Sequence, residues 1–191
     1  QKNEQGYRNK MEYNFWFDND TNLVSLALHK RGSHQKLSVK GSILATENIN
    51  RAGSELIEFI NKNKIEDRQI KSVIIRSDTK GTVGVSLFVN DKKVKKLFSQ
   101  INIKNSIFEI LYSNPKSPAS VATEILLKPE RNLTDSILGK DFYYTSRSFF
   151  QVNVPIYETV LQIIRESIKS SKIKNILELY SGVGSIGLSV V

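Results

Sequence analysis

The chain has 191 residues, 39% hydrophobic and 25% charged, a composition typical of a globular protein with one or two domains. It contains neither an apolar run of about 18 residues nor the apolar core of a signal peptide at its N-terminus, so we expect a cytoplasmic protein without membrane contact. The net charge of +9 favours a polyanionic partner such as nucleic acid, and the absence of cysteine excludes disulfides and thiol chemistry within these residues.

Residues 1–146 are predicted to form an α+β domain that is rich in strands. Alternating apolar residues and intervening turn residues predict strands over 7–18, 23–29, 37–39, 70–76, 83–89, 106–112 and 122–127. The first two form a predicted hairpin. Helices are predicted over 47–62, with Thr46 as the N-cap, and over 91–98.

The pattern changes after residue 146. Pro155 suits the first turn of a helix, which continues with apolar residues on one predicted face at Ile156, Val160, Ile164 and Ile168. Residues 174–180, with the apolar run over 176–179, are then predicted to form a buried parallel strand that enters a glycine turn and a new helix. Residues 147–191 are therefore predicted to begin an α/β, Rossmann-like domain.

The glycine turn is the first candidate ligand site. Gly182, Gly184 and Gly187 fit the GxGxxG pattern, and glycine lets the backbone approach a bound molecule closely. The pattern alone allows a nicotinamide dinucleotide or a structural turn without a ligand. Glu178, four residues before the first glycine, makes the turn resemble the first motif of S-adenosylmethionine-dependent methyltransferases.

Four segments in the same order resemble one family. The string SRSFFQVN at 146–153 is similar to the SFFQ-N signature of RNA uracil-C5 methyltransferases, which modify uridines in 23S ribosomal RNA or transfer RNA. The segments GYRNKMEYNF at 6–15, LALHKRG at 26–32 and ELYSGVGSIGL at 178–188 resemble further motifs of this family. We expect 23S ribosomal RNA as the favoured target and transfer RNA as the alternative.

The resemblance implies S-adenosyl-L-methionine as the cofactor. The positions that match the family's cofactor contacts are Gln151, Tyr180, Gly182, Gly184 and Ser185. Family members often have Asn or Thr where Ser185 stands, so this match is weaker than the others. Glu178 is expected to orient the turn or to bind the cofactor's ammonium group.

The family mechanism requires a cysteine thiolate that adds to C6 of uracil and a carboxylate base that removes the C5 proton. The resemblance assigns both groups to the far half of the catalytic domain, so no catalytic residue is predicted within this chain. We expect a fragment that is inactive alone, whose residues 147–191 are poorly ordered when isolated.

Basic residues on the first strands are the candidates for RNA binding. Arg8, Lys10, Lys30 and Arg31 are predicted to contact phosphates, and Arg147 to meet either an RNA phosphate or the cofactor carboxylate. No metal site and no protein partner are predicted. A noncatalytic RNA-binding module and a nicotinamide-dependent oxidoreductase are the alternatives.

Overall fold

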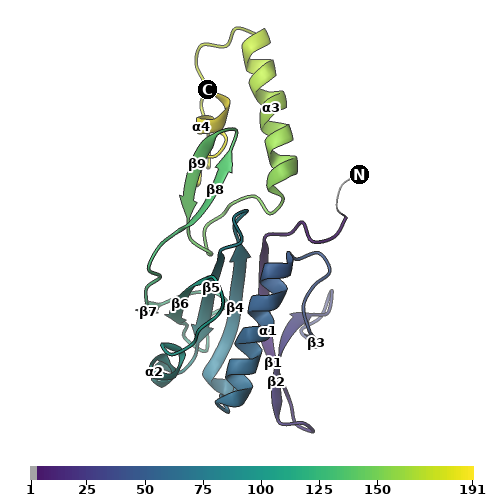
Figure 1. The fold of residues 1–191 in the computed structure, drawn as a ribbon, viewed down its shortest axis with the longest axis vertical. Coiled ribbons are helices and arrows are strands. Elements are labelled where there is room, and N and C mark those ends of the chain that lie inside the picture. The colour runs from purple at the N-terminus through teal and green to yellow at the C-terminus, as the bar shows by residue number, and fades with distance from the viewer. Residues whose placement is uncertain (1–3) are drawn as a thin grey trace.

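The computed structural model describes residues 4–191. The larger of its two sheets is mixed and has seven strands (Figure 1). The strand order is β3-β2-β1-β4-β5-β6-β7. The strands are β1 (Lys10–Asp18), β2 (Leu23–His29), β3 (Lys36–Val39), β4 (Ile70–Ser77), β5 (Val83–Val89), β6 (Ser106–Tyr112) and β7 (Glu124–Leu127). All seven were predicted from the sequence to within a few residues.

Neighbouring strands pair in antiparallel fashion except β5 and β6, which are parallel. The predicted hairpin of β1 and β2 is confirmed. A parallel pair needs a crossover connection. Here this connection contains a short 3-10 turn (Lys92–Val94) and α2 (Lys95–Phe98), as the sequence predicted.

Helix α1 (Glu47–Lys62) covers one face of the sheet. Its buried side chains, which pack on the sheet, are Ile49, Ala52, Leu56 and Ile60. Gly53 faces β2, where a Cβ atom would lie 2.9 Å from Leu26 Cδ1, so glycine allows the helix to approach the sheet closely. Thr46 is the N-cap residue as predicted, but its side chain makes no capping hydrogen bond.

No helix covers the opposite face of the sheet within residues 4–191 (Figure 1). A small cluster of Ile74, Phe88 and Leu111 lies there beneath the loop that follows β6. Lys71 of β4 holds this loop, since its ammonium group donates hydrogen bonds to the carbonyls of Asn114 and Ser117 at 2.8 and 2.6 Å.

A second hairpin, β8 (Leu133–Ile137) and β9 (Lys140–Tyr144), lies beyond one end of the sheet beside α3 (Val154–Ser170) and α4 (Gly187–Val190) (Figure 1). The sequence did not predict this hairpin. Its inward positions alternate, but Asp135 occupies one of them and is fully buried. A charged residue at an inward position hides the two-residue apolar period on which the prediction depends.

The hairpin and α3 share one hydrophobic core. Its buried members are Ile107, Leu133, Ile137, Phe142, Tyr144, Phe150, Val154, Leu161 and Val190. Residues on both sides of position 146 therefore pack together. The domain boundary at 146 stays a prediction.

One prediction about the C-terminal part is wrong, and another holds in part. Residues 174–180 form no strand, and Leu177 and Leu179 are 83% and 72% exposed, because no strand of residues 4–191 lies beside them to complete a sheet. Helix α3 forms as predicted and packs on the second hairpin and α4 through Val154 and Leu161. Ile164 and Ile168 of its predicted apolar face pack against this core, whereas Ile156 and Val160 are 62% and 45% exposed.

Candidate functional site

Residues 145–153, called here the connecting segment, join the second hairpin to α3 and contain the SFFQ string. Arg76 of β4 holds the middle of this segment: its guanidinium donates to the carbonyls of Ser148 and Phe150 at 2.9 and 3.1 Å. Phe150 is buried and stacks on the ring of Tyr144 at a centroid distance of 4.4 Å. The SFFQ string is thus held to the sheet through Arg76 and to the second hairpin through the contact of Phe150 with Tyr144.

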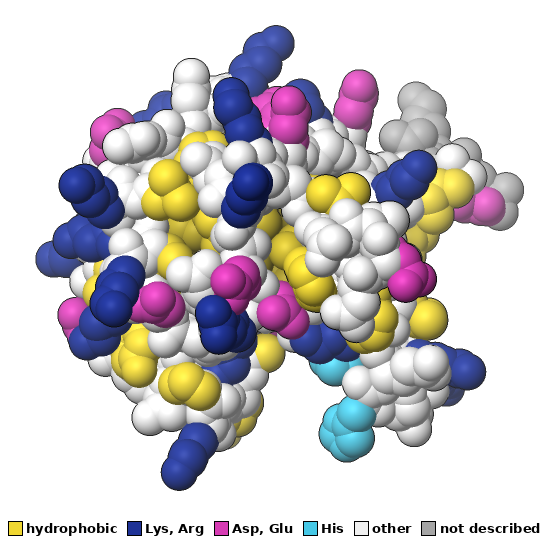
Figure 2. Space-filling model, turned by 90° about the horizontal axis from the view of Figure 1, so that it is seen from below, with side chains coloured by type: hydrophobic (Ala, Val, Ile, Leu, Met, Phe, Trp, Pro, Cys, Tyr) yellow, Lys and Arg dark blue, Asp and Glu magenta, His cyan; other side chains and the backbone are white. Residues whose placement is uncertain are grey.

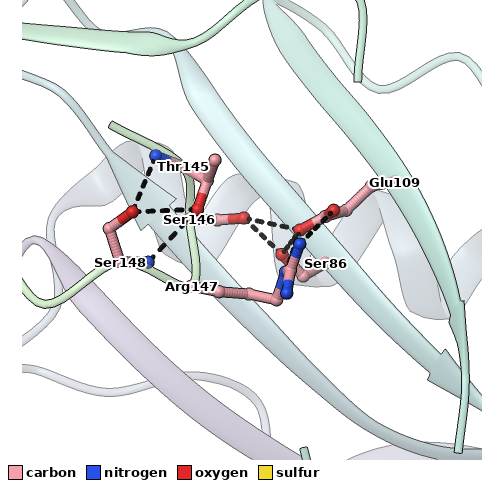
Figure 3. Close-up of polar contacts among 6 residues, drawn as sticks. All are labelled: Ser86, Glu109, Thr145, Ser146, Arg147 and Ser148. Atoms are coloured by element: carbon pink, nitrogen blue, oxygen red, sulfur yellow. Dashed lines mark hydrogen bonds and ion pairs between the residues drawn. The ribbon is translucent and has the colours of Figure 1, made fainter. Parts of the chain in front are cut away.

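A buried carboxylate holds the start of the connecting segment (Figure 3). Glu109 of β6 is 2% exposed and accepts hydrogen bonds from Ser86, from Ser146 at 3.3 Å and from Arg147 Nε at 3.0 Å. Ser86 and Ser146 also bond each other. Arg147 was predicted to meet RNA or the cofactor, whereas the structure pairs its guanidinium with Glu109.

Asn9 holds the end of the connecting segment. Its side-chain NH2 group donates to the carbonyl of Gln151 at 3.0 Å, and its backbone N–H donates to the carbonyl of Val152 at 3.0 Å. These two contacts engage the backbone around Gln151 and do not involve its side-chain amide. The GYRNK string at the start of β1 and the SFFQ string therefore lie side by side.

This arrangement brings two of the predicted RNA-binding residues close to a predicted cofactor-binding residue. Arg8 and Lys10 flank Asn9 in the sequence, and Arg8 Nε donates to the carbonyl of Lys10 at 3.0 Å. Burial, and then the positive charge of Arg76, lower the pKa of Lys10. The beginning of β1 is thus a partly buried cluster of positive charge beside Gln151, which favours a nearby anion.

The other two RNA-binding candidates lie elsewhere. Lys30 and Arg31 are exposed in the turn between β2 and the edge strand β3. Figure 2 shows that Lys and Arg side chains surround the sheet end of the molecule, with acidic side chains between them, and form no single patch on this face. The net charge is therefore distributed over several elements.

The glycine turn is formed as predicted, although the strand before it is not. Tyr180, Gly182 and Gly184 have positive φ angles of 57°, 57° and 74°. Two of these positions carry glycine, which adopts such angles without strain. The Tyr180 side chain is fully exposed, and a Cβ atom at Gly182 would meet no atom of residues 4–191 within 4 Å. The turn thus leaves an open surface at which a ligand can approach the backbone.

Two side chains fix the turn. Glu178 accepts a hydrogen bond from the backbone N–H of Gly187 at 2.9 Å, so it has the loop-orienting role that was one of its two predicted roles. A Cβ atom at Gly187 would lie 2.5 Å from the Glu178 carboxylate, which explains the third glycine. The hydroxyl of Ser185 bonds that of Tyr157 in α3 at 2.8 Å. This contact places the turn against the first half of α3, the helix that follows Gln151 directly.

A buried polar network joins the second hairpin to the turn between β4 and β5. Asp135 accepts hydrogen bonds from the backbone N–H and hydroxyl of Thr79 at 2.7 and 2.6 Å, and from the hydroxyl of Tyr144. Burial, followed by the hydrogen bond with Asp135, raises the pKa of Tyr144 well above its usual range. The guanidinium of Arg76 lies 5.4 Å from the centre of the Tyr144 ring.

The sequence did not predict Arg76, Asn9, Glu109 or Asp135 as site residues. For Arg76 and Glu109, the sequence signal that could have indicated a buried polar contact was a charged residue inside an apolar strand, in IKSVIIRS and SIFEILY respectively. Within residues 4–191, no helix is long and apolar enough to cross a membrane, and no three His, Asp or Glu side chains are grouped as metal ligands.

Comparison with solved structures defines the class of fold. The chain aligns over 99% of its length with 47% of the Pyrococcus abyssi tRNA (uracil-54, C5)-methyltransferase, a structure determined in complex with S-adenosyl-L-homocysteine. The TM-score is 0.75 at 17% sequence identity. The chain therefore has the fold of the corresponding part of an RNA methyltransferase.

The family follows from the sequence comparison. Residues 1–191 match the model of the tRNA (Uracil-5-)-methyltransferase family, and the chain belongs to this family. It is 29% identical over 199 residues to an uncharacterized RNA methyltransferase of Fusobacterium nucleatum, covering 96% of this chain and 42% of that protein. It is 25% identical to the tRNA/tmRNA (uracil-C(5))-methyltransferase of Campylobacter jejuni, covering 96% and 50%. The chain thus spans about half the length of these relatives.

Proposed function

We propose that this chain acts within an RNA (uracil-C5)-methyltransferase that transfers a methyl group from S-adenosyl-L-methionine to a uridine. In this proposal residues 1–146 face the RNA, and residues 147–191 are the first part of a Rossmann-like catalytic domain. The acceptor is a uridine of 23S ribosomal RNA, which the sequence motifs favour, or of transfer RNA, the substrate in the names of two similar proteins.

One observation carries the proposal: the hydrogen bond from Asn9 to the carbonyl of Gln151, which joins residues 142 positions apart. It brings the basic start of β1 to the segment that carries the proposed cofactor contact. Methyl transfer requires the methyl donor to meet C5 of the target uracil, so the RNA backbone must be held near the cofactor. The hydrogen bond between Asn9 and Gln151 therefore supports a methyl-transfer site at the junction of β1 and the connecting segment.

The residues of the connecting segment and the glycine turn fit a cofactor with an amino acid moiety. The side-chain amide of Gln151 offers both a donor and an acceptor to a carboxylate and an ammonium group. Gly182 and Gly184 allow backbone approach, while the hydroxyl of Ser185 and the exposed ring of Tyr180 supply a polar and an apolar contact. The bound cofactor supplies the methyl group, and these residues bind and orient it.

The proposed RNA contacts are electrostatic. Arg8 and Lys10 place positive charge beside Gln151, and Lys30 and Arg31 are separate exposed charges in the turn between β2 and β3. Phosphate contacts of this kind position an RNA without reading its sequence. The choice of uridine must therefore depend on contacts other than these four.

The full-length protein that contains residues 1–191 tests the proposal directly. It is incubated with S-adenosylmethionine labelled in its methyl group and with transcripts of 23S ribosomal RNA or transfer RNA, and the RNA is digested to nucleosides. The proposal expects label in 5-methyluridine from one of these transcripts. RNA binding without labelled nucleoside would indicate the noncatalytic RNA-binding module instead, and binding of a nicotinamide cofactor alone would indicate the oxidoreductase.

A further inference from the structure

We propose that Arg76 is a positioning residue, which fixes the connecting segment so that the side chain of Gln151 points to the cofactor. The inference rests on the proposed function. Arg76 is among the largest fully buried side chains of residues 4–191, with 1% exposure. It forms no salt bridge with any residue in this range. A buried cation is costly unless its donors are satisfied by good hydrogen bonds. Arg76 directs its two terminal nitrogens to the backbone of the SFFQ string, while its Nε finds no hydrogen-bond partner among residues 4–191.

The geometry of this contact constrains the chain on both sides of Phe149. The carbonyls of Ser148 and Phe150 are bound by the two terminal nitrogens of one planar guanidinium, at 2.9 and 3.1 Å. The fork geometry of arginine holds both carbonyls in a fixed relation, which a single-point contact does not. Phe150 is then buried on the second hairpin, while the Phe149 side chain is directed to the surface.

Gln151 is the next residue, and Asn9 binds its carbonyl at 3.0 Å. The peptide group before Gln151 is thus held by Arg76, through the carbonyl of Phe150, and the peptide group after it by Asn9. With both peptide groups fixed, the direction of the Gln151 Cα–Cβ bond is fixed as well. A side chain presented in this way loses less conformational freedom when it binds a ligand.

Lys71 provides a matched control on the same strand. Like Arg76, it is a cation of β4 that donates to two backbone carbonyls on the helix-free face, those of Asn114 and Ser117. Its partners belong to the loop after β6 and not to the connecting segment. A general loss of rigidity would result from either substitution, whereas misplacement of Gln151 would result only from a change at Arg76.

The experiment measures binding of S-adenosylhomocysteine to the full-length protein by isothermal titration, with a melting curve for each variant. Arg76→Gln is expected to weaken binding about tenfold, the factor that follows from ordering one long side chain. Arg76→Lys, which keeps the charge and one donor direction, is expected to lie between Arg76→Gln and the wild type. Lys71→Met is expected to stay within about twofold of the wild type, because distant sites act independently.

Hydrogen exchange supplies a readout of position. The amides of Ser148 and Asn9, which donate to the carbonyls of Thr145 and Val152 at 3.1 and 3.0 Å, should exchange faster in both Arg76 variants and at the wild-type rate in Lys71→Met. The inference is overturned if folded Arg76→Gln and Arg76→Lys bind S-adenosylhomocysteine like the wild type, or if Lys71→Met weakens binding equally. If Arg76→Gln does not fold, Arg76→Lys decides. A wild-type protein that fails to bind S-adenosylhomocysteine would reject the proposed function itself, and the inference with it.

Discussion

Substitution of Asp135 tests whether the second hairpin is fixed to the sheet by its buried polar network. The carboxylate accepts two hydrogen bonds from Thr79, at 2.7 and 2.6 Å, and one from the buried hydroxyl of Tyr144. Hydrogen bonds to a charged group contribute about 1.5–3 kcal/mol, and an orphaned buried hydroxyl costs about 1–3 kcal/mol. Thr79 itself is exposed, so water can replace its lost partner. We therefore expect Asp135→Ala to lower the free energy of unfolding by about 3 kcal/mol.

Urea unfolding of the chain, followed by circular dichroism, measures this loss. Asp135→Asn keeps a carbonyl acceptor and should lose less than half as much. Adding Tyr144→Phe to Asp135→Ala removes the orphaned hydroxyl, so the double variant should recover about 1 kcal/mol. Asp141→Ala, which breaks a surface contact with Ser136, is the control and should change stability by less than about 0.5 kcal/mol. A loss below about 1 kcal/mol for Asp135→Ala would refute this account of the hairpin.

Three further predictions concern the turn, the network and the basic residues. Because the raised pKa of Tyr144 makes the unfolded chain lose this proton first, the free energy of unfolding should fall as the pH rises above 10.0, by at most about 1.4 kcal/mol per pH unit. Tyr144→Phe should flatten that decline in urea titrations, and an unchanged slope would contradict the assignment. Gly187→Ala places a Cβ atom 2.5 Å from the Glu178 carboxylate, so amide hydrogen exchange across the turn should accelerate by about tenfold or more. Protection equal to the wild type would show that the hydrogen bond to Glu178 does not hold the turn. Arg31→Glu should weaken RNA binding and reduce the salt dependence of log K by about 1. Lys62→Glu, at the exposed end of α1 and outside the predicted RNA contacts, should leave both unchanged.

Local pattern was sufficient for the seven-stranded sheet and α1. The strands of the sheet alternate or are continuously apolar, and α1 repeats its apolar residues with helical spacing, so each element carries its own signal. The glycine turn over 178–188 was also visible, because its glycines and Glu178 lie within one short stretch. These features depend on neighbours in sequence.

The remaining features depend on contacts between distant residues. An aspartate such as Asp135 is expected on a surface when it is considered alone, and its burial is explained by hydrogen bonds from Tyr144 and from Thr79, 56 positions away. Arg76 likewise meets Phe150 across 74 positions. The predicted strand over 174–180 failed for the related reason that a strand forms only beside a partner, and no strand of residues 4–191 is placed there. A single sequence shows neither kind of contact.

Binding of S-adenosylhomocysteine by the full-length protein tests the central claim most directly, with Gln151→Ala as the paired variant. Loss of a hydrogen bond to a charged group is worth about 1.5–3 kcal/mol, so affinity should fall by about tenfold or more. The account predicts saturable binding by the wild type and this loss in Gln151→Ala at an unchanged melting temperature. Equal affinity of the two proteins would contradict the role assigned to Gln151, and absence of binding by the wild type would contradict the claim as a whole.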